Sequence, residues 1–121
     1  MRRISAKKRK RDREARPFRE QLLIEVGRCE ICGNRWIDGL IVHEIARGFS
    51  RSAALDKRYA VLVVCNGCHD KVDGWTRIRQ LRVLKRSRPA DYDLVAFNKL
   101  VGYGENRITE EDVEREMPNV I

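Results

Sequence analysis

The four cysteines of this chain constrain its fold more than any other feature. They form two C-x2-C pairs, Cys29 with Cys32 and Cys65 with Cys68, and 32 residues separate the pairs. Two such pairs predict a tetrahedral four-thiolate zinc site, because a two-residue gap lets both sulfurs of one turn reach the same ion. A redox dithiol and buried free thiols are the alternative interpretations. Since thiolates would fill all four positions, the predicted zinc is structural and closed to water.

A structural metal suits a chain of this size. Its 121 residues predict one small domain, whose core alone is often only marginally stable. The longest apolar run, residues 60–65, is far shorter than the roughly 20 residues that span a membrane. The N-terminus is too highly charged for a secretory signal peptide. We therefore expect a soluble, cytoplasmic protein that makes no membrane contact.

The positive charge of the chain is concentrated at its N-terminus. Residues 1–16 hold nine lysines and arginines against two acidic residues, which leaves only +1 of the total net charge of +8 for the remainder. This pattern predicts a flexible basic arm that follows a phosphate backbone and releases counterions, although a tail that only aids solubility is the alternative. The candidate nucleic-acid-binding residues of the arm are Lys7, Lys8, Arg9, Lys10 and Arg11.

The first half of the chain is typical of a helix followed by a hairpin. A helix is expected from Pro17 to Val26, since proline favours the first helical position. Residues 35–43 predict a β-hairpin that turns at residues 38–39, an Asp-Gly pair. A loop is expected over residues 46–59.

The second half of the chain predicts one strand and several helices. Apolar and β-branched side chains at residues 60–64 indicate a buried strand that leads into a short helix at 68–73. Further helices are expected at 75–86, after a cap at Asp91, and after a capping box at 109–112. The predicted fold is α+β, with a disordered basic arm at 1–16, a zinc-stapled ββα-metal core with its N-terminal helix at 17–74, and a helical extension at 75–121.

The two histidines of the chain both lie beside the predicted zinc framework. His43 ends a predicted strand, and His69 directly follows Cys68. His69 and Asp73 are four residues apart, so they share one face of a helix. Together with His43 they could hold a divalent cation and leave positions open for water and phosphate, which metal-assisted phosphodiester cleavage requires.

With these residues in place, the sequence resembles the HNH endonuclease family. The matching stretches are Cys29-Glu-Ile-Cys32, Val42-His43-Glu44-Ile45 and Leu62-Val-Val-Cys65-Asn-Gly-Cys68-His69. The resemblance covers roughly residues 27–74. It implies a zinc-stapled ββα-metal site and a metal-dependent endonuclease that hydrolyses phosphodiester bonds in nucleic acid, with DNA as the favoured substrate. It also implies a small stand-alone nuclease of the kind that phages and mobile elements carry.

The resemblance assigns roles to individual residues of this chain. His43 and His69 take the places of ligands to a catalytic cation, which could be Mg²⁺, Mn²⁺, Ni²⁺ or a second Zn²⁺. Asp73 stands where some family members carry an extra ligand. Glu44 takes the place of the general base, where the family usually has histidine. In a register shifted by one residue, His43 becomes the base and Val42 occupies the ligand place.

The sequence departs from the family pattern at three positions. The asparagine that orients the base is replaced by Ala60, and Lys71 stands two residues after the final histidine instead of three. Glu44 is a weak base at neutral pH unless burial raises its pKa, which is ordinarily about 4.3. A zinc-stapled nucleic-acid-binding protein without catalysis is therefore the alternative function.

Four arginines outside the arm are further candidates for binding nucleic acid, with double-stranded DNA as the favoured partner. Arg47 and Arg51 follow the histidine strand and could form bidentate hydrogen bonds with a phosphate, or could simply face solvent. Residues 77–88 contain no acidic side chain. We expect Arg77 and Arg82 from this stretch to grip flanking phosphates without reading sequence.

Overall fold

The computed structural model describes residues 6–35, 39–45, 56–102 and 107–116 as a small mixed fold of helices and one two-stranded sheet. This arrangement agrees with the predicted α+β class. The elements in chain order are α1 (Ala6–Val26), β1 (Leu40–Glu44), a 3-10 turn (Arg58–Ala60), β2 (Val61–Cys65), α2 (Asn66–Val72), α3 (Arg77–Ser87), α4 (Leu94–Val101) and α5 (Glu110–Arg115).

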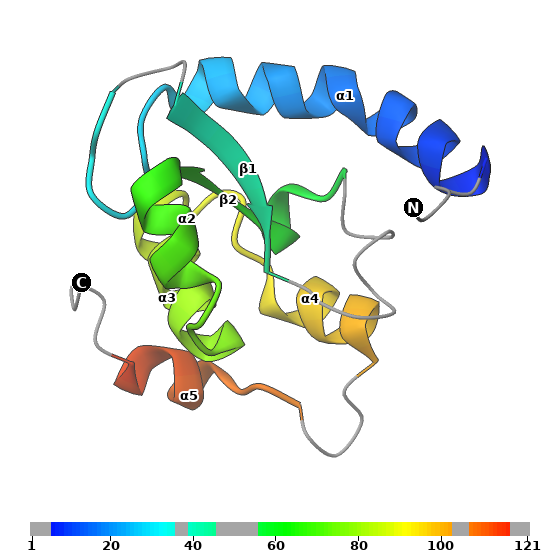
Figure 1. Ribbon diagram of the computed structural model, residues 1–121. Coiled ribbons are helices and arrows are strands. Elements are labelled where there is room, and N and C mark those ends of the chain that lie inside the picture. The colour runs from blue at the N-terminus through cyan, green and yellow to red at the C-terminus, as the bar shows by residue number, and fades with distance from the viewer. Residues whose placement is uncertain (1–5, 36–38, 46–55, 103–106, 117–121) are drawn as a thin grey trace.

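The sheet lies between helices on both of its faces. β1 and β2 run antiparallel, with Leu40 opposite Cys65 and Glu44 opposite Val61. Residues 61–64 of β2 are fully buried, as expected for a strand that is covered on both sides. Figure 1 shows α1 along one side of this sheet and α2 with α3 on the other.

The predicted hairpin over residues 35–43 is described only at Arg35, at Gly39 and in its second strand. β1 begins close to the expected place, but its partner is β2, and Arg35 belongs to no strand and is exposed. Residues 36–38 lie outside the described residues. The described partner of β1 is the apolar strand β2, and four of the five residues of β2 are buried.

The predicted boundary between a basic arm and a helix at Pro17 is also wrong. α1 begins at Ala6 and continues through Pro17 as one helix of 21 residues. Lysine, arginine, alanine and glutamate all favour helix, which explains why the basic segment joins it. Ala15 is buried before the proline and Leu22 after it, so α1 contacts the body on both sides of Pro17.

The C-terminal helices form close to their expected positions, with one different cap. Asp93, not Asp91, caps α4, and its Oδ1 accepts a hydrogen bond of 3.0 Å from Ala96 N. The expected capping box between Thr109 and Asp112 is present and starts α5.

One hydrophobic core unites all these elements. Buried side chains from α1, both strands and the helices α2 to α5 form a single cluster, so the segment after residue 74 is continuous with the ββα part. The largest fully buried members include Leu22, Leu62, Leu84, Phe97 and Val113. Within the described ranges, no helix is both long and apolar enough to cross a membrane.

Candidate functional site

The four cysteines converge as their spacing predicts. Cys29 and Cys32 lie in the turn after α1, while Cys65 ends β2 and Cys68 lies in the first turn of α2. Their four sulfur atoms all lie within 4.8 Å of one another, and Cys32 Sγ is 3.8 Å from Cys65 Sγ. A tetrahedral zinc ion with bonds of about 2.3 Å places its sulfur ligands about 3.8 Å apart. The cluster could therefore hold a metal ion, and its geometry is compatible with zinc.

The backbone around the first cysteine pair shapes this cluster. Gly33 has a φ of +80°, a conformation that strains other residues, and its N–H donates to Cys29 O at 2.9 Å. The Cys32 N–H points at Cys29 Sγ at 3.5 Å. Burial raises the pKa of the Cys29 thiol, but hydrogen bonds from backbone groups, that of Cys32 foremost, outweigh it and lower the pKa to about 7. The thiolate that a metal requires is thus favoured at this position.

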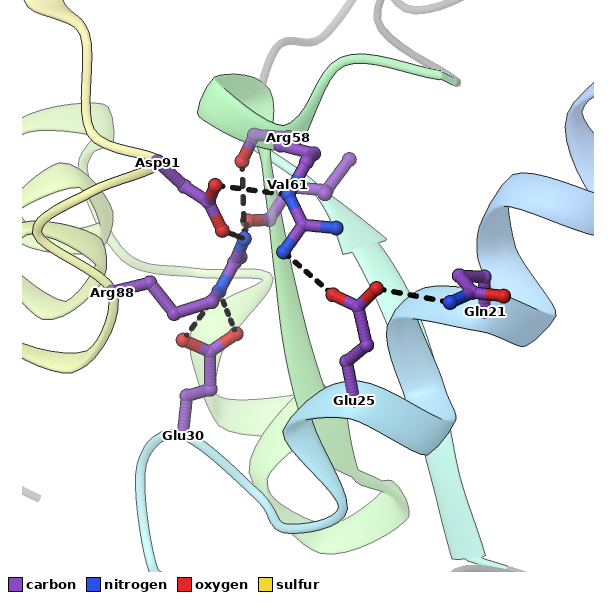
Figure 2. Close-up of polar contacts among 7 residues, drawn as sticks. All are labelled: Gln21, Glu25, Glu30, Arg58, Val61, Arg88 and Asp91. Atoms are coloured by element: carbon purple, nitrogen blue, oxygen red, sulfur yellow. Dashed lines mark hydrogen bonds and ion pairs between the residues drawn. The ribbon is translucent and has the colours of Figure 1, made fainter.

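A buried carboxylate ties the first cysteine pair to the rest of the fold. The Glu30 side chain is fully buried between the two cysteines, and it accepts a hydrogen bond of 2.8 Å from Val63 N. Arg88 Nε lies 3.1 and 3.0 Å from its two oxygens (Figure 2). The same guanidinium donates to Val61 O at 2.6 Å. Arg88 therefore joins the cysteine turn, β2 and the end of α3.

Further ion pairs extend this cluster toward α1. Asp91 accepts from Arg88 Nη1 at 2.9 Å and from Arg58 Nε at 2.9 Å. Burial alone would raise the pKa of Asp91, but the two arginines lower it below its ordinary value. Arg58 also pairs with Glu25 of α1 at 2.8 Å, and Gln21 donates to Glu25 at 3.0 Å (Figure 2). No local spacing in the sequence connects the members of this cluster, so it was not predicted.

The two histidines lie side by side, His43 on strand β1 and His69 on helix α2. Their ring centroids are 5.2 Å apart, and the rings meet edge to face at 71°. His43 is only 3% exposed, whereas His69 is half-buried. Burial lowers the pKa of His43 below its ordinary value, although a hydrogen bond with Gln80 opposes this shift, and the nearby His69 lowers the pKa further. The neutral imidazole is therefore favoured at pH 7. The expectation that the fold brings the two imidazoles together is confirmed.

A glutamine that the sequence analysis missed completes the surroundings of His43. Gln80 of α3 is fully buried, and its Oε1 lies 2.8 Å from His43 Nε2. The side-chain amide of Gln80 also donates to Trp75 O at 3.0 Å. One signal was available, since Gln80 stands four residues before the apolar Leu84 on the same helix face.

Glu44 and Asp73 do not complete a group of three close metal-ligating side chains with the histidines. Glu44 follows His43 on β1, so it points to the other face of the sheet, where it pairs with Arg19 of α1. Asp73 is exposed just after α2. Among the residues that the structure describes, the four cysteines are the one group of three or more metal-ligating side chains with mutually close ligand atoms. His43, His69 and Asp73 do not form such a group.

The predicted nucleic-acid-binding residues fall in three classes. On α1, Lys10 is exposed and lies 3.9 Å from Glu14, and the structure describes only the backbone of Lys7, Lys8, Arg9 and Arg11. Arg47 and Arg51 lie outside the described residues. On α3, Arg77 and Arg82 are half-buried.

Helix α5 compensates part of the basic charge of α3. Lys85 donates to Glu110 at 3.1 Å and also pairs with Glu114. Its ammonium lies 5.3 Å from the centre of the Tyr92 ring. The surface of α3 is therefore less positive than its sequence suggests.

No protein-family model, no curated protein and no solved structure matches the chain.

Proposed function

We propose that this protein is a metal-dependent endonuclease of the HNH type, in which the cysteine cluster holds a structural zinc ion. The observation that supports it most is the contact of His43 and His69, with ring centroids 5.2 Å apart between a strand and a helix. Cys68 directly precedes His69, so a metal on the thiolates would fix the position of this second imidazole. Two imidazoles beside a zinc-stapled ββα unit are what the family resemblance implies.

The chemistry of the histidines suits this proposal. A neutral imidazole can ligate a cation, and the lowered pKa of His43 keeps it neutral at pH 7. A divalent cation held by His43 and His69 would bind the scissile phosphate and stabilise the charge that builds on the leaving oxygen. The half-buried His69 keeps one side of the pair open to solvent, where water and phosphate could enter.

Glu44 has a different role in this proposal from the one that the sequence suggested. Its carboxylate pairs with Arg19 on the opposite face of the sheet, away from the side that His43 shares with Gln80. We therefore propose that Glu44 holds α1 against the sheet. The general base then lies on the other face of the sheet, which carries the histidines.

The proposed partner is nucleic acid, with double-stranded DNA favoured. Most of the net positive charge of the chain lies in the first 16 residues. Residues 6–16 of that segment are helical, and Lys10, Arg13 and Arg16 are exposed there. Exposed cations on a helix can follow phosphates and release counterions. The four unpaired cysteines fit a reducing, cytoplasmic setting, which is part of the proposal.

Nicking of supercoiled plasmid tests the proposal directly. Zinc-loaded wild type should convert supercoiled to open-circular DNA with at least one of Mg²⁺, Mn²⁺, Ni²⁺ or added Zn²⁺, and excess EDTA should stop the reaction. His69→Ala should lose this activity. A wild type that binds plasmid but cuts with none of the four metals would contradict the proposal.

That negative outcome would favour the second candidate, a zinc-stapled nucleic-acid-binding protein without catalysis. The observation in its favour is that Glu44 pairs with Arg19 on the opposite face of the sheet from His43.

A further inference from the structure

We infer that Gln80 is a positioning residue for the histidine pair: it holds His43 as the Nε2–H tautomer and leaves Nδ1 as the ring nitrogen that binds a cation or accepts a proton. The catalytic meaning of this inference rests on the proposed endonuclease function. The tautomer itself does not, because it follows from the hydrogen bonds of the folded chain.

The orientation of the Gln80 amide follows from its second partner. The backbone carbonyl of Trp75 can only accept hydrogen bonds, so the NH₂ group of Gln80 must face it, at 3.0 Å. Rotating the amide by half a turn would place two oxygen atoms against each other in a buried position, which is costly. The carbonyl oxygen of Gln80 therefore faces His43.

The protonation of the His43 ring follows from this orientation. Gln80 Oε1 can only accept, and it lies 2.8 Å from His43 Nε2. His43 Nε2 therefore carries a hydrogen and donates it. In a neutral imidazole the other nitrogen, Nδ1, then has the free lone pair.

Burial strengthens this constraint. Gln80 is fully buried and His43 is 3% exposed, so water cannot easily replace either partner. The start of α3 is itself held in place, because Thr76 caps the helix by accepting from Arg79 N at 3.2 Å. The Arg79 guanidinium also stacks on the Trp75 ring, 3.6 Å from its centre. These contacts fix the short segment that carries Gln80.

The inference brings a third element into the site. The resemblance to the HNH family covers β1, β2 and α2, and the family position for an orienting asparagine holds Ala60. Gln80 lies on α3, outside that segment, and it supplies a side-chain amide that orients an imidazole. The residues after 74 are then required for the site as well as for the core.

Nitrogen-15 NMR of the full, zinc-loaded chain tests the tautomer. With labelled histidine, we expect His43 Nδ1 to resonate as an unprotonated nitrogen and Nε2 as a protonated one. Gln80→Leu should lose this preference and give a mixture of tautomers. Gln21→Leu on the exposed side of α1 is the matched control and should leave the His43 signals unchanged. An Nδ1–H tautomer in wild type would overturn the inference even if no variant folds.

Plasmid nicking tests the positioning role. Gln80→Leu should lower kcat by about 10- to 100-fold, the usual cost of losing a residue that orients a ligand, and should leave KM for plasmid nearly unchanged. Equal rates for Gln80→Leu and wild type would overturn the role. Absent nicking by wild type with the expected tautomer would instead contradict the endonuclease proposal alone.

Discussion

The cysteine cluster and the histidine pair lie on neighbouring residues of α2, yet they are built very differently. The four cysteines bring all their sulfur atoms within 4.8 Å of one another, which is enough to fill a tetrahedral shell. The two histidines meet at 5.2 Å without a third ligand among the described residues. A closed ligand set suits a structural ion, and an incomplete one leaves room for a substrate. The proposed function assigns stability to the first centre and chemistry to the second.

The two centres also differ in the charge of the side chains that hold them in place. The cysteine turn is held by an ionised pair, Glu30 with Arg88, which is buried and shared with β2. The histidine pair is oriented by a neutral amide, Gln80. Burial lowers the pKa of His43 despite the hydrogen bond with Gln80, whereas a carboxylate in the same place would favour the protonated form more strongly than the amide does.

Removing the metal should have the largest effect if the cysteine cluster carries the fold. Metal analysis should find about one tightly held zinc per chain, and Cys32→Ser or a strong chelator should unfold the protein, because metal binding is coupled to folding in such sites. Circular dichroism melting checks this. A zinc-free protein with a normal melting curve would show that the cysteine cluster has no structural role, and the contrast between the cluster and the histidine pair would then fail.

Breaking the buried ion pair should have the next largest effect. Arg88→Met leaves the Glu30 carboxylate buried without its cation, so the free energy of unfolding should fall by about 3–5 kcal/mol. Urea unfolding of zinc-loaded protein measures it. Arg115→Met removes an exposed arginine that also pairs with an aspartate, and it is the matched control that should melt as wild type does. A loss no larger than that of the control would show that Glu30 finds another partner.

Removing positive charge from α1 should weaken DNA binding and should leave the cysteine cluster and the histidine pair unchanged. The double variant Arg13→Gln, Arg16→Gln should reduce the affinity for DNA at low salt and lower the slope of log affinity against log salt by about 2, one for each lost phosphate contact. Fluorescence anisotropy over a salt series measures both. Unchanged affinity and slope would show that this helix does not contact phosphate.

Glu44→Gln should have the smallest effect on stability and nicking. It tests whether Glu44 and the histidines work on opposite faces of the sheet. Glutamine can still accept a hydrogen bond from Arg19, so stability should fall by about 1 kcal/mol or less. Nicking should stay within about threefold of wild type, since Glu44 faces α1. A loss of about 10²-fold or more, typical of a general base, would restore Glu44 to the catalytic role that the sequence first suggested.

The parts of this molecule that the sequence predicts are those encoded within a few residues. The C-x2-C spacing predicts the convergence of the cysteines, and the Thr109–Asp112 pattern predicts the start of α5. The apolar run at residues 60–64 predicts β2 to within one residue. In each of these cases the physical cause, a short turn, a cap or a buried strand, acts locally.

The parts that the sequence could not predict depend on residues far apart in the chain. Nothing in the local pattern connects Glu30 with Arg88, or His43 with Gln80, because these contacts exist only after α3 packs against the sheet. The pairing of β1 with β2 likewise joins segments that are far apart in the chain, and no local pattern encodes it. The basic segment became helical because its side chains favour helix, a preference that charge counting alone overlooks.

The central claim is that the histidine pair performs the chemistry while the cysteine cluster holds the fold. The measurement that tests it most directly is zinc content and plasmid nicking on one preparation of His43→Ala, compared with wild type. The account predicts about one zinc per chain and a folded protein in both, with nicking lost in the variant alone. Nicking by His43→Ala at the wild-type rate, with zinc still bound, would contradict it.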